Sequence, residues 1–262
     1  MLRAEALGLG YAGRMLIEGL SVDLRAGEVW GVLGRNGSGK STLLHALAGL
    51  RPPDAGAVSL DGEPLGTLPR RRLARRVGVL LQQDSGEFWG STRDYVLLGR
   101  YPHARSPFGW SAEDERIADG ELGLHHLDGL AHRAFVSLSG GERQRARAAA
   151  LFTQRPAAYL LDEPLQNLDL PHQVAMLERL ALEARERGAL VLMVLHDLLF
   201  AARYCSRFLL LSGEGRWHAG GAADAFSAAR LGELYGFALT PVDAGGERLF
   251  LPQRPSGPGP HV

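Results

Sequence analysis

The feature that most constrains this chain is GRNGSGKST, residues 34–42, which contains its single lysine, Lys40. Every other residue in the Lys+Arg total of 29 is an arginine. An apolar stretch, VWGVL, precedes the segment, and the helix-forming sequence STLLHALAGL overlaps its end. The segment therefore has the G-x-x-x-x-G-K-S pattern of a phosphate-binding loop between a strand and a helix.

The chemistry of phosphate binding explains why lysine stands at this position. Glycines let the backbone wrap a phosphate chain, and the N-terminus of the following helix attracts the same anion. Lysine adds a compact charge on a flexible stem, whereas arginine is a broad planar fork and is not equivalent. A glycine-rich turn with a chance lysine is the alternative, but the flanking strand and helix argue against it. The predicted nucleotide-binding residues are Gly34, Arg35, Asn36, Gly37, Ser38, Gly39, Lys40, Ser41 and Thr42.

Composition excludes several classes of partner. The 262 residues carry a formal net charge of zero, with a pI of about 7.2, which gives no general attraction to nucleic acid or anionic lipid. We interpret the arginine cluster in residues 70–76 as a solvated helix face, because no aromatic residues interleave it, and we expect no nucleic-acid partner. The single cysteine, Cys205, excludes an internal disulfide and suits a reducing cytosol.

The N-terminal sequence lacks the features of a secretory signal. No run of residues approaches the roughly 20 apolar residues of a membrane span. If the protein works at a membrane, we expect another chain to cross it.

Strands alternate with helices along most of the sequence, which predicts an α/β fold with a mostly parallel sheet covered on both faces. From about residue 91 to 137 the pattern is helical and predicts a separate helical part. Residues 253–262, which include the Pro- and Gly-rich RPSGPGPHV, are expected to be a disordered tail. The predicted strands lie near residues 3–9, 20–25, 28–33, 57–60, 77–82, 157–161 and 190–195, and the predicted helices near 41–50, 69–76, 141–154, 171–187 and 197–203.

Two further motifs fit a nucleotide site. The apolar strand in AAYLLDEP ends in Asp162, which could hold Mg²⁺ together with Ser41, and the next residue, Glu163, could polarise an attacking water. Alone, these acids could equally cap a strand at the surface. The segment LSGGERQR, residues 138–145, opens a helix with a second glycine loop, and the N-terminus of that helix is expected to be a second anion site. One chain with one nucleotide has little use for both loops, whereas two chains facing each other could each close the partner's site.

These motifs, in this order, resemble the ATP-binding subunit of an ABC transporter over nearly the whole chain. GRNGSGKS is similar to the Walker A loop, LLDEP to Walker B and LSGGE to the signature sequence. Gln82 is in the position of the Q-loop glutamine, and His196 resembles the switch histidine that contacts the γ-phosphate. QNLD, ending in Asp169, resembles the D-loop. Tyr11 is where the family places an aromatic residue against adenine.

The resemblance implies a P-loop NTPase fold of ABC type. It has an N-terminal antiparallel β part and a helical subdomain, about residues 84–137, inserted into a RecA-like core within a domain of residues 1–252. It implies a homodimer that binds ATP and Mg²⁺ and joins a permease dimer, with a periplasmic substrate-binding protein as an indirect partner. Such a subunit is peripheral, at the cytoplasmic face of the inner membrane. Phe88, Trp89 and Trp110 are candidate permease contacts or core residues.

The implied roles in catalysis divide between the two chains of the dimer. Glu163 is the general base, His196 steadies the γ-phosphate, and Ser41, Asp162 and Gln82 organise Mg²⁺. Asp169 lies at the dimer seam. The signature residues that would act on the partner's ATP are Ser139, Gly140, Gly141 and Glu142.

Three segments resemble the ATPases of iron-chelate, haem and cobalamin importers, with cobalamin narrowly favoured as cargo. The alternative is a soluble ABC-type ATPase that does not transport, such as a subunit of an iron–sulfur assembly scaffold. The motifs alone do not separate these two functions. The segments are VLLGRYPHARSPFGW, DLPHQ and LYGFALTPVDAGGERLFLP.

Overall fold

A six-stranded, mostly parallel sheet forms the centre of the molecule in this computed structural model, which describes residues 1–82, 88–104 and 109–253. Five strands run parallel, and only the edge strand β10 is antiparallel to its neighbour. Four of the five parallel strands are apolar along most of their length, because a strand that is covered on both faces buries the side chains on both. In spatial order the strands are β10 (Arg216–Gly221), β9 (Arg207–Gly213), β3 (Val29–Gly34), β8 (Leu190–Val194), β7 (Ala158–Asp162) and β6 (Val77–Leu80).

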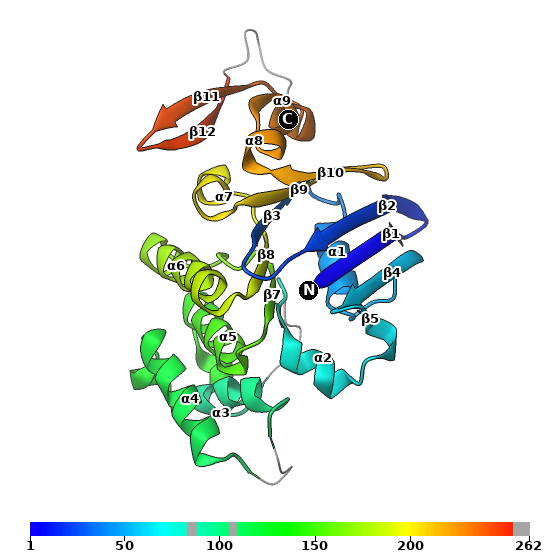
Figure 1. The fold of residues 1–262 in the computed structure, drawn as a ribbon. Coiled ribbons are helices and arrows are strands. Elements are labelled where there is room, and N and C mark those ends of the chain that lie inside the picture. Colours follow the sequence, from blue (N-terminus) through cyan, green and yellow to red (C-terminus); the bar gives the residue numbers. More distant parts are fainter. Residues whose placement is uncertain (83–87, 105–108, 254–262) are drawn as a thin grey trace.

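A separate antiparallel sheet covers one side of this central sheet (Figure 1). Its strands, in spatial order, are β2 (Arg14–Leu24), β1 (Leu2–Tyr11), β4 (Ala55–Leu60) and β5 (Glu63–Pro64). Helix α1 (Lys40–Leu47) contributes Leu43, Leu44 and Leu47 to the aliphatic core that joins the two sheets. The prediction of a strand near residues 20–25 was too short. β2 begins at Arg14, because Ala12 and Gly13 adopt positive φ angles of 49° and 79° and turn the chain back as a hairpin.

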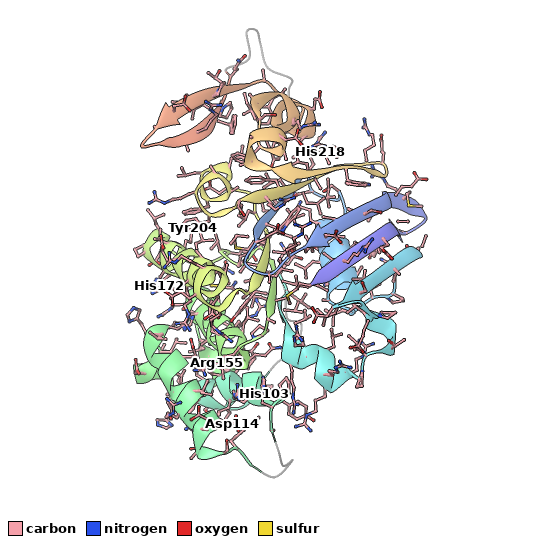
Figure 2. The ribbon with its side chains drawn as sticks, viewed as in Figure 1. His103, Asp114, Arg155, His172, Tyr204 and His218 are labelled. Carbon is pink, nitrogen blue, oxygen red and sulfur yellow. The ribbon has the colours of Figure 1, made fainter. Side chains whose placement is uncertain are left out.

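Helices α5 (Gly140–Gln154) and α6 (Leu170–Arg187) lie on the opposite side of the central sheet, and α3 (Thr92–Leu97) and α4 (Ala112–Leu124) lie at one end of the molecule (Figure 1). The hairpin of β11 (Leu239–Ala244) and β12 (Glu247–Pro252) lies at the opposite end. In the helical part, the buried side chains of Arg100 and Asp114 form an ion pair at 2.7 Å, and Figure 2 labels Asp114 there. The remaining elements are α2 (Arg70–Arg76), α7 (Leu198–Tyr204), α8 (Ala222–Ala225) and α9 (Ala228–Tyr235), with 3₁₀ turns at Leu65–Thr67, Leu98–Arg100, Asp128–Leu130 and Phe135–Ser137.

The arginine cluster on α2 is exposed, as the prediction of a solvated helix face requires. Arg71 and Arg75 both donate to the carbonyl oxygen of Pro102, at 3.0 and 2.7 Å. The others bind the Gly49 carbonyl, Glu63 and Asp61. These solvated guanidinium groups therefore also connect α2 to its neighbours.

The three aromatic residues proposed as permease contacts divide into two kinds. Phe88 packs edge-on against Tyr95 at 5.4 Å between ring centroids, and Trp110 packs against the same helical core. Trp89 is 76% exposed. The first two are therefore partly buried against the helical core, whereas Trp89 is largely on the surface. Parts of the predicted groove segment 84–110, and all of the tail after Gln253, lie outside the described residues.

Candidate active site

The phosphate-binding loop connects β3 to α1, as the sequence predicts. Gly39 caps α1 with a φ of 101°, a left-handed conformation that L side chains rarely adopt. A Cβ atom on Gly34 would lie 2.5 Å from the carbonyl oxygen of Leu211 on β9. These two glycines therefore allow a turn, and a close approach of two strands, that other residues would prevent.

Lys40 is the first residue of α1 and is only 7% exposed. Its Nζ donates to the carbonyl oxygens of Gly34 and Arg35, at 2.8 and 3.1 Å. Burial lowers the pKa of this ammonium group, and the nearby carboxylates of Glu163 and Asp162 partly offset that effect. The loop thus holds its cation inside the turn, where a phosphate oxygen could replace a carbonyl as its partner.

The tips of three adjacent parallel strands bring together the other predicted catalytic residues. Gln82 follows β6, Glu163 follows β7 and His196 follows β8, and these strands are neighbours in the order β8–β7–β6. Because all three strands run in the same direction, their carboxyl ends meet at one edge of the sheet. Sequence positions as far apart as 82 and 196 therefore become neighbours.

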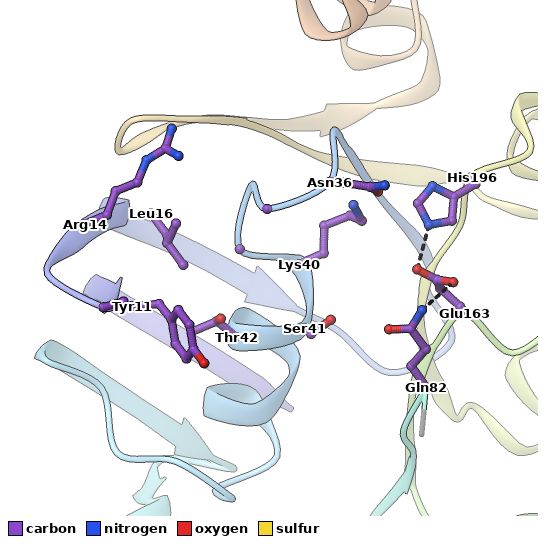
Figure 3. A pocket seen from close by; sticks show the side chains of 13 residues that line it. Tyr11, Arg14, Leu16, Asn36, Lys40, Ser41, Thr42, Gln82, Glu163 and His196 are labelled. Atoms are coloured by element: carbon purple, nitrogen blue, oxygen red, sulfur yellow. Dashed lines mark hydrogen bonds and ion pairs between the residues drawn. The ribbon is translucent and has the colours of Figure 1, made fainter. Parts of the chain in front are cut away.

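Glu163 is the centre of this cluster (Figure 3). Its Oε2 accepts a hydrogen bond from Nε2 of Gln82 at 3.0 Å, and its Oε1 contacts Nε2 of His196 at 2.7 Å. Its backbone has a φ of 49°, which is uncommon for a residue with a side chain. Strained conformations of this kind occur preferentially at functional sites. The arrangement can hold a carboxylate beside a substrate and can orient it from both sides.

Asp162, the last residue of β7, is 2% exposed, and its Oδ1 has no hydrogen-bond partner. A buried carboxylate oxygen without a partner is costly unless a cation or a water binds it. The nearby Ser41 hydroxyl and Gln82 amide offer further oxygen ligands, the type that Mg²⁺ prefers. These residues therefore fit a magnesium ion carried by a phosphate chain.

A pocket of about 920 Å³ connects the hairpin β1–β2 to the phosphate loop and to the Glu163 cluster. Tyr11 lies at its outer end and is 68% exposed (Figure 3). Ten of the sequence-predicted residues line this pocket, whereas Gly34, Arg35, Ser38 and Asp162 lie outside its lining. The ten are Tyr11, Asn36, Gly37, Gly39, Lys40, Ser41, Thr42, Gln82, Glu163 and His196.

Sequence reasoning missed three residues of the pocket wall, which are Ala12, Arg14 and Leu16. All three belong to the hairpin turn or to the start of β2, the strand whose beginning was predicted too late. The Ala-Gly pair between two apolar stretches was the signal that could have placed the turn.

The signature residues do not line this pocket. Ser139 caps α5, and it forms a capping box with Glu142, because its backbone N–H donates to Oε2 of Glu142 at 2.7 Å. That hydrogen bond also lowers the pKa of Glu142. A Cβ atom on Gly141 would lie 3.0 Å from the carbonyl oxygen of Asn167, so the loop packs against the segment that follows Glu163. The signature loop is therefore an ordered helix start that is not part of the pocket around the phosphate loop, and its role as a second anion site stays a prediction.

Asp169 has a structural role within the chain. Its Oδ1 accepts from the backbone N–H of His172 at 3.2 Å and so caps α6, and it also contacts the His172 ring. The hydrogen bonds from His172 lower the pKa of Asp169. Its predicted place at a dimer seam stays a prediction.

Comparisons with known proteins agree with this geometry. Residues 17–166 match the family model described as ABC transporter. The hemin import ATP-binding protein HmuV of Rhodococcus jostii is 39% identical over 97% of this chain and 86% of its own length. The ferric enterobactin transport ATP-binding protein FepC of Escherichia coli is 38% identical over 96% of this chain and 93% of its own length.

Among solved structures, one described as a metal-chelate type ABC transporter in an inward-facing conformation superposes with a TM-score of 0.82. It is 28% identical in sequence, and the match covers 97% of this chain and 98% of that one. The extent of these matches includes both sheets, the helical part and the site. The chain therefore belongs to the ABC transporter family, as an ATP-binding subunit that couples ATP hydrolysis to transport.

Proposed function

We propose that this subunit supplies energy for the import of an iron chelate, haem or a ferric siderophore, through a separate permease. The relatives reported above are named for hemin and ferric enterobactin, which supports iron chelates as the cargo class. Their names do not support the narrow preference for cobalamin that three segments of the sequence suggested. The proposal also assigns ATP hydrolysis to this pocket. The observation that carries this part is that Gln82 and His196 hold the Glu163 carboxylate beside the phosphate loop.

The predicted site residues receive the following roles in this proposal. Lys40 and the backbone of residues 37–42 bind the phosphates, and Tyr11 contacts the adenine. Glu163 accepts a proton from the attacking water, and His196 steadies the γ-phosphate. Bound Mg²⁺, held by Ser41, Asp162 and Gln82, would neutralise charge on the phosphate oxygens. Preorganised charge and positioning supply most of the rate enhancement in such reactions.

The absence of the signature loop from the pocket lining supports a homodimer. Ser139, Gly140, Gly141 and Glu142 form a finished helix start that is absent from the lining of their own pocket. In a head-to-tail dimer, this loop would close over the nucleotide of the partner, with Asp169 near the seam. A dimer of this kind leaves the helical part, about residues 84–137 of the domain 1–252, free to meet a permease dimer.

Trp89 is the best candidate for a permease contact, because it is exposed while Phe88 and Trp110 are packed. No helix in the described parts of the chain has both the length and the apolar character of a membrane crossing. We place the subunit at the cytoplasmic face of the inner membrane, with a periplasmic binding protein as an indirect partner. The relatives' names favour this assembly over a soluble ATPase that does not transport.

Purification of the tagged chain from its own membranes tests the transport half. We expect a polytopic permease to accompany it, and liposomes containing the complex should take up labelled haemin or a ferric siderophore only when ATP is present. Uptake of cobalamin instead would correct the cargo. A soluble scaffold as the only partner would overturn the transport proposal.

The substitution Glu163→Gln tests the ATPase half. Removing a general base typically lowers turnover by about 10² to 10⁴ fold, and the amide keeps the size of the side chain. We expect ATP to bind the variant with nearly unchanged affinity and to accumulate unhydrolysed in a closed dimer. Glu233→Gln, an exposed carboxylate on α9, is the matched control and should hydrolyse ATP at the parental rate. Parental turnover in Glu163→Gln would show that another group is the base.

A further inference from the structure

Two polar side chains on the signature helix α5 reach the backbone on either side of the catalytic pair. Gln144 is 5% exposed, and its Nε2 donates to the carbonyl oxygen of Pro164 at 2.8 Å. Arg147 donates through Nη2 to the carbonyl oxygen of Leu81. Leu81 directly precedes Gln82, and Pro164 directly follows Glu163. The signature helix therefore holds the backbone next to both residues of the pair.

The two side chains are also connected to each other. Nη1 of Arg147 donates to Oε1 of Gln144 at 3.1 Å. They are three residues apart and so lie on the same face of α5. The result is a continuous polar bridge from the Leu81 carbonyl through Arg147 and Gln144 to the Pro164 carbonyl. The direct hydrogen bond from Gln82 to Glu163 runs alongside this bridge.

We infer that Gln144 and Arg147 are positioning residues, which set the separation of Gln82 and Glu163 according to where the signature helix lies. Neither side chain lines the nucleotide pocket, so both act through the backbone and not on the substrate. The inference rests on the proposed roles of Glu163 and Gln82, and it adds a physical connection between them and the signature loop.

The same helix begins at the signature loop, so the bridge connects that loop to the backbone beside Gln82 and Glu163. Ser139 caps α5 only five residues before Gln144, and Gly141 packs against the Asn167 carbonyl. A shift of the loop toward a partner's nucleotide moves α5 as a rigid rod, and the bridge carries that shift to the Leu81 and Pro164 carbonyls. In the present arrangement both oxygens of Glu163 are engaged, by Gln82 and by His196. Movement of α5 is therefore a way to change the contacts that hold the base.

Two substitutions test the inference, of which Gln144→Glu is nearly isosteric and Arg147→Met keeps only the unbranched stem of the side chain. Gln144→Glu removes the donor to the Pro164 carbonyl, and Arg147→Met removes the donors to both the Leu81 carbonyl and Gln144. We expect each to lower kcat for ATP by roughly tenfold, because displacement of a reacting group on the order of an ångström costs up to 10² fold. KM for ATP should change by less than about twofold, because the phosphate loop is untouched. The double variant should lose little more than the worse single variant, since the bridge acts as one unit.

Arg145→Met is the matched control on the same helix. Arg145 also donates to two backbone carbonyls, those of His125 and His126, both at 2.9 Å, but these lie away from the catalytic pair. It should lower the melting temperature about as much as Arg147→Met while leaving kcat at the parental value. A second readout does not need turnover. Hydrogen exchange of peptides that contain Leu81 and Pro164 should accelerate in the two bridge variants and not in the control.

The outcomes separate this inference from the proposed function. If the parent hydrolyses ATP and Glu163→Gln does not, while both bridge variants keep parental kcat and parental exchange, the bridge has no positioning role. An equal loss of kcat in Arg145→Met would reduce the effect to general destabilisation and would also overturn the inference. If Glu163→Gln keeps full turnover, the proposed base is wrong, and the exchange experiment still decides whether the bridge holds these segments.

Discussion

The central sheet and the helical part of this protein are held together by different physical means. The core around the sheet is mainly aliphatic, with Leu160, Leu190 and Leu192 completely buried. The helical part has a smaller apolar cluster and relies more on directional polar contacts. Its helices α3 and α4, like α5, each begin with a serine capping box, and buried ion pairs hold α4 in place.

This difference indicates which region can move. A parallel strand buried on both faces cannot shift without opening cavities on each side. Polar contacts such as Arg179 on α6 with Glu121 on α4, at 3.1 Å, can break and form again one at a time. The phosphate loop and the Glu163 cluster belong to the fixed region, whereas Ser139 stands where the helical part meets it. The strands that carry the Glu163 cluster are therefore fixed by the core, and adjustment is left to the segments after the strand ends, which α5 contacts through Gln144 and Arg147.

The largest expected effect is in the core. Leu192→Ala on β8 removes a completely buried side chain from a central strand, and should lower the free energy of unfolding by about 3 to 5 kcal/mol. Urea denaturation followed by circular dichroism measures it, with Leu251→Ala, at a position that is 54% exposed, as a control that should change little. A loss below about 1 kcal/mol would mean that the core repacks freely, which would contradict the description of the central sheet as the fixed region.

The next effect is in the helical part, at Asp114. Its carboxylate binds Arg100 at 2.7 Å and Ser111 Oγ at 2.6 Å, and Asp114→Asn leaves the guanidinium without its counter-charge. We expect a loss of about 3 kcal/mol at neutral pH. The exposed neighbour Glu113, whose pairing with Arg116 faces solvent, is the control, and Glu113→Gln should leave the free energy of unfolding nearly unchanged.

At acid pH, the difference in free energy of unfolding between the parent and Asp114→Asn should disappear. Burial acts to raise the pKa of Asp114, but the hydrogen bonds from Ser111 and Arg100 outweigh it and leave the pKa lowered. A carboxyl with a lowered folded pKa contributes stability above its unfolded pKa of about 3.9, and loses it as pH falls through the folded value. The parent and Asp114→Asn should therefore converge below about pH 4. Unchanged separation there would show that the ion pair is not the cause.

The smallest effect concerns His125 at the end of α4. Burial lowers the pKa of this ring to about 4, whereas an unfolded histidine titrates near 6.5. The unfolded chain therefore binds the proton first, and stability falls as pH drops through this window. Between pH 7 and pH 5 we expect a loss of about 2 kcal/mol in the parent that is absent from His125→Asn. Urea titrations at both pH values measure it.

His126→Asn is the control for that titration. His126 has a φ of 53°, which asparagine tolerates, so this substitution changes the neighbouring ring without new strain. It should keep the parental pH dependence. The buried Cys205 does not contribute to this titration, because a thiol is already neutral between pH 5 and 7 and burial raises its pKa further, to about 12. If the free energy of unfolding depends on pH equally in the parent, His125→Asn and His126→Asn, His125 is not the acid-sensitive group.

The sequence predicted which residues gather around the pocket better than where the surrounding strands begin. Lys40, Glu163 and His196 line that pocket because each comes shortly after the end of an apolar strand, and parallel strands bring such ends together. Their catalytic roles stay predictions. The start of β2 was missed because the Ala12–Gly13 turn is short and the strand after it lacks strict alternation. Arg14 was lost with it. The domain boundaries, including 84–137, stay predictions.

Contacts made through the backbone were beyond the reach of sequence patterns. Nothing in the spacing of Gln144 and Arg147 indicates that they reach the carbonyls of Leu81 and Pro164, because that depends on which face of α5 packs on the sheet. The same limit applied to Phe88 and Trp89, two adjacent aromatic residues of which one is partly buried and the other exposed. Packing orientation, and not residue type, separates these two.

The isolation of Lys40 has a practical consequence in protein chemistry. It is the single side-chain amine of the chain, it is 7% exposed, and its Nζ is engaged by two carbonyl oxygens. Amine-directed reagents such as activated esters therefore find no lysine on the outer surface. The rate at which they acylate Lys40 therefore measures how often the phosphate loop opens. Mass spectrometry of the one peptide that contains Lys40 gives this rate, and no label has to be introduced.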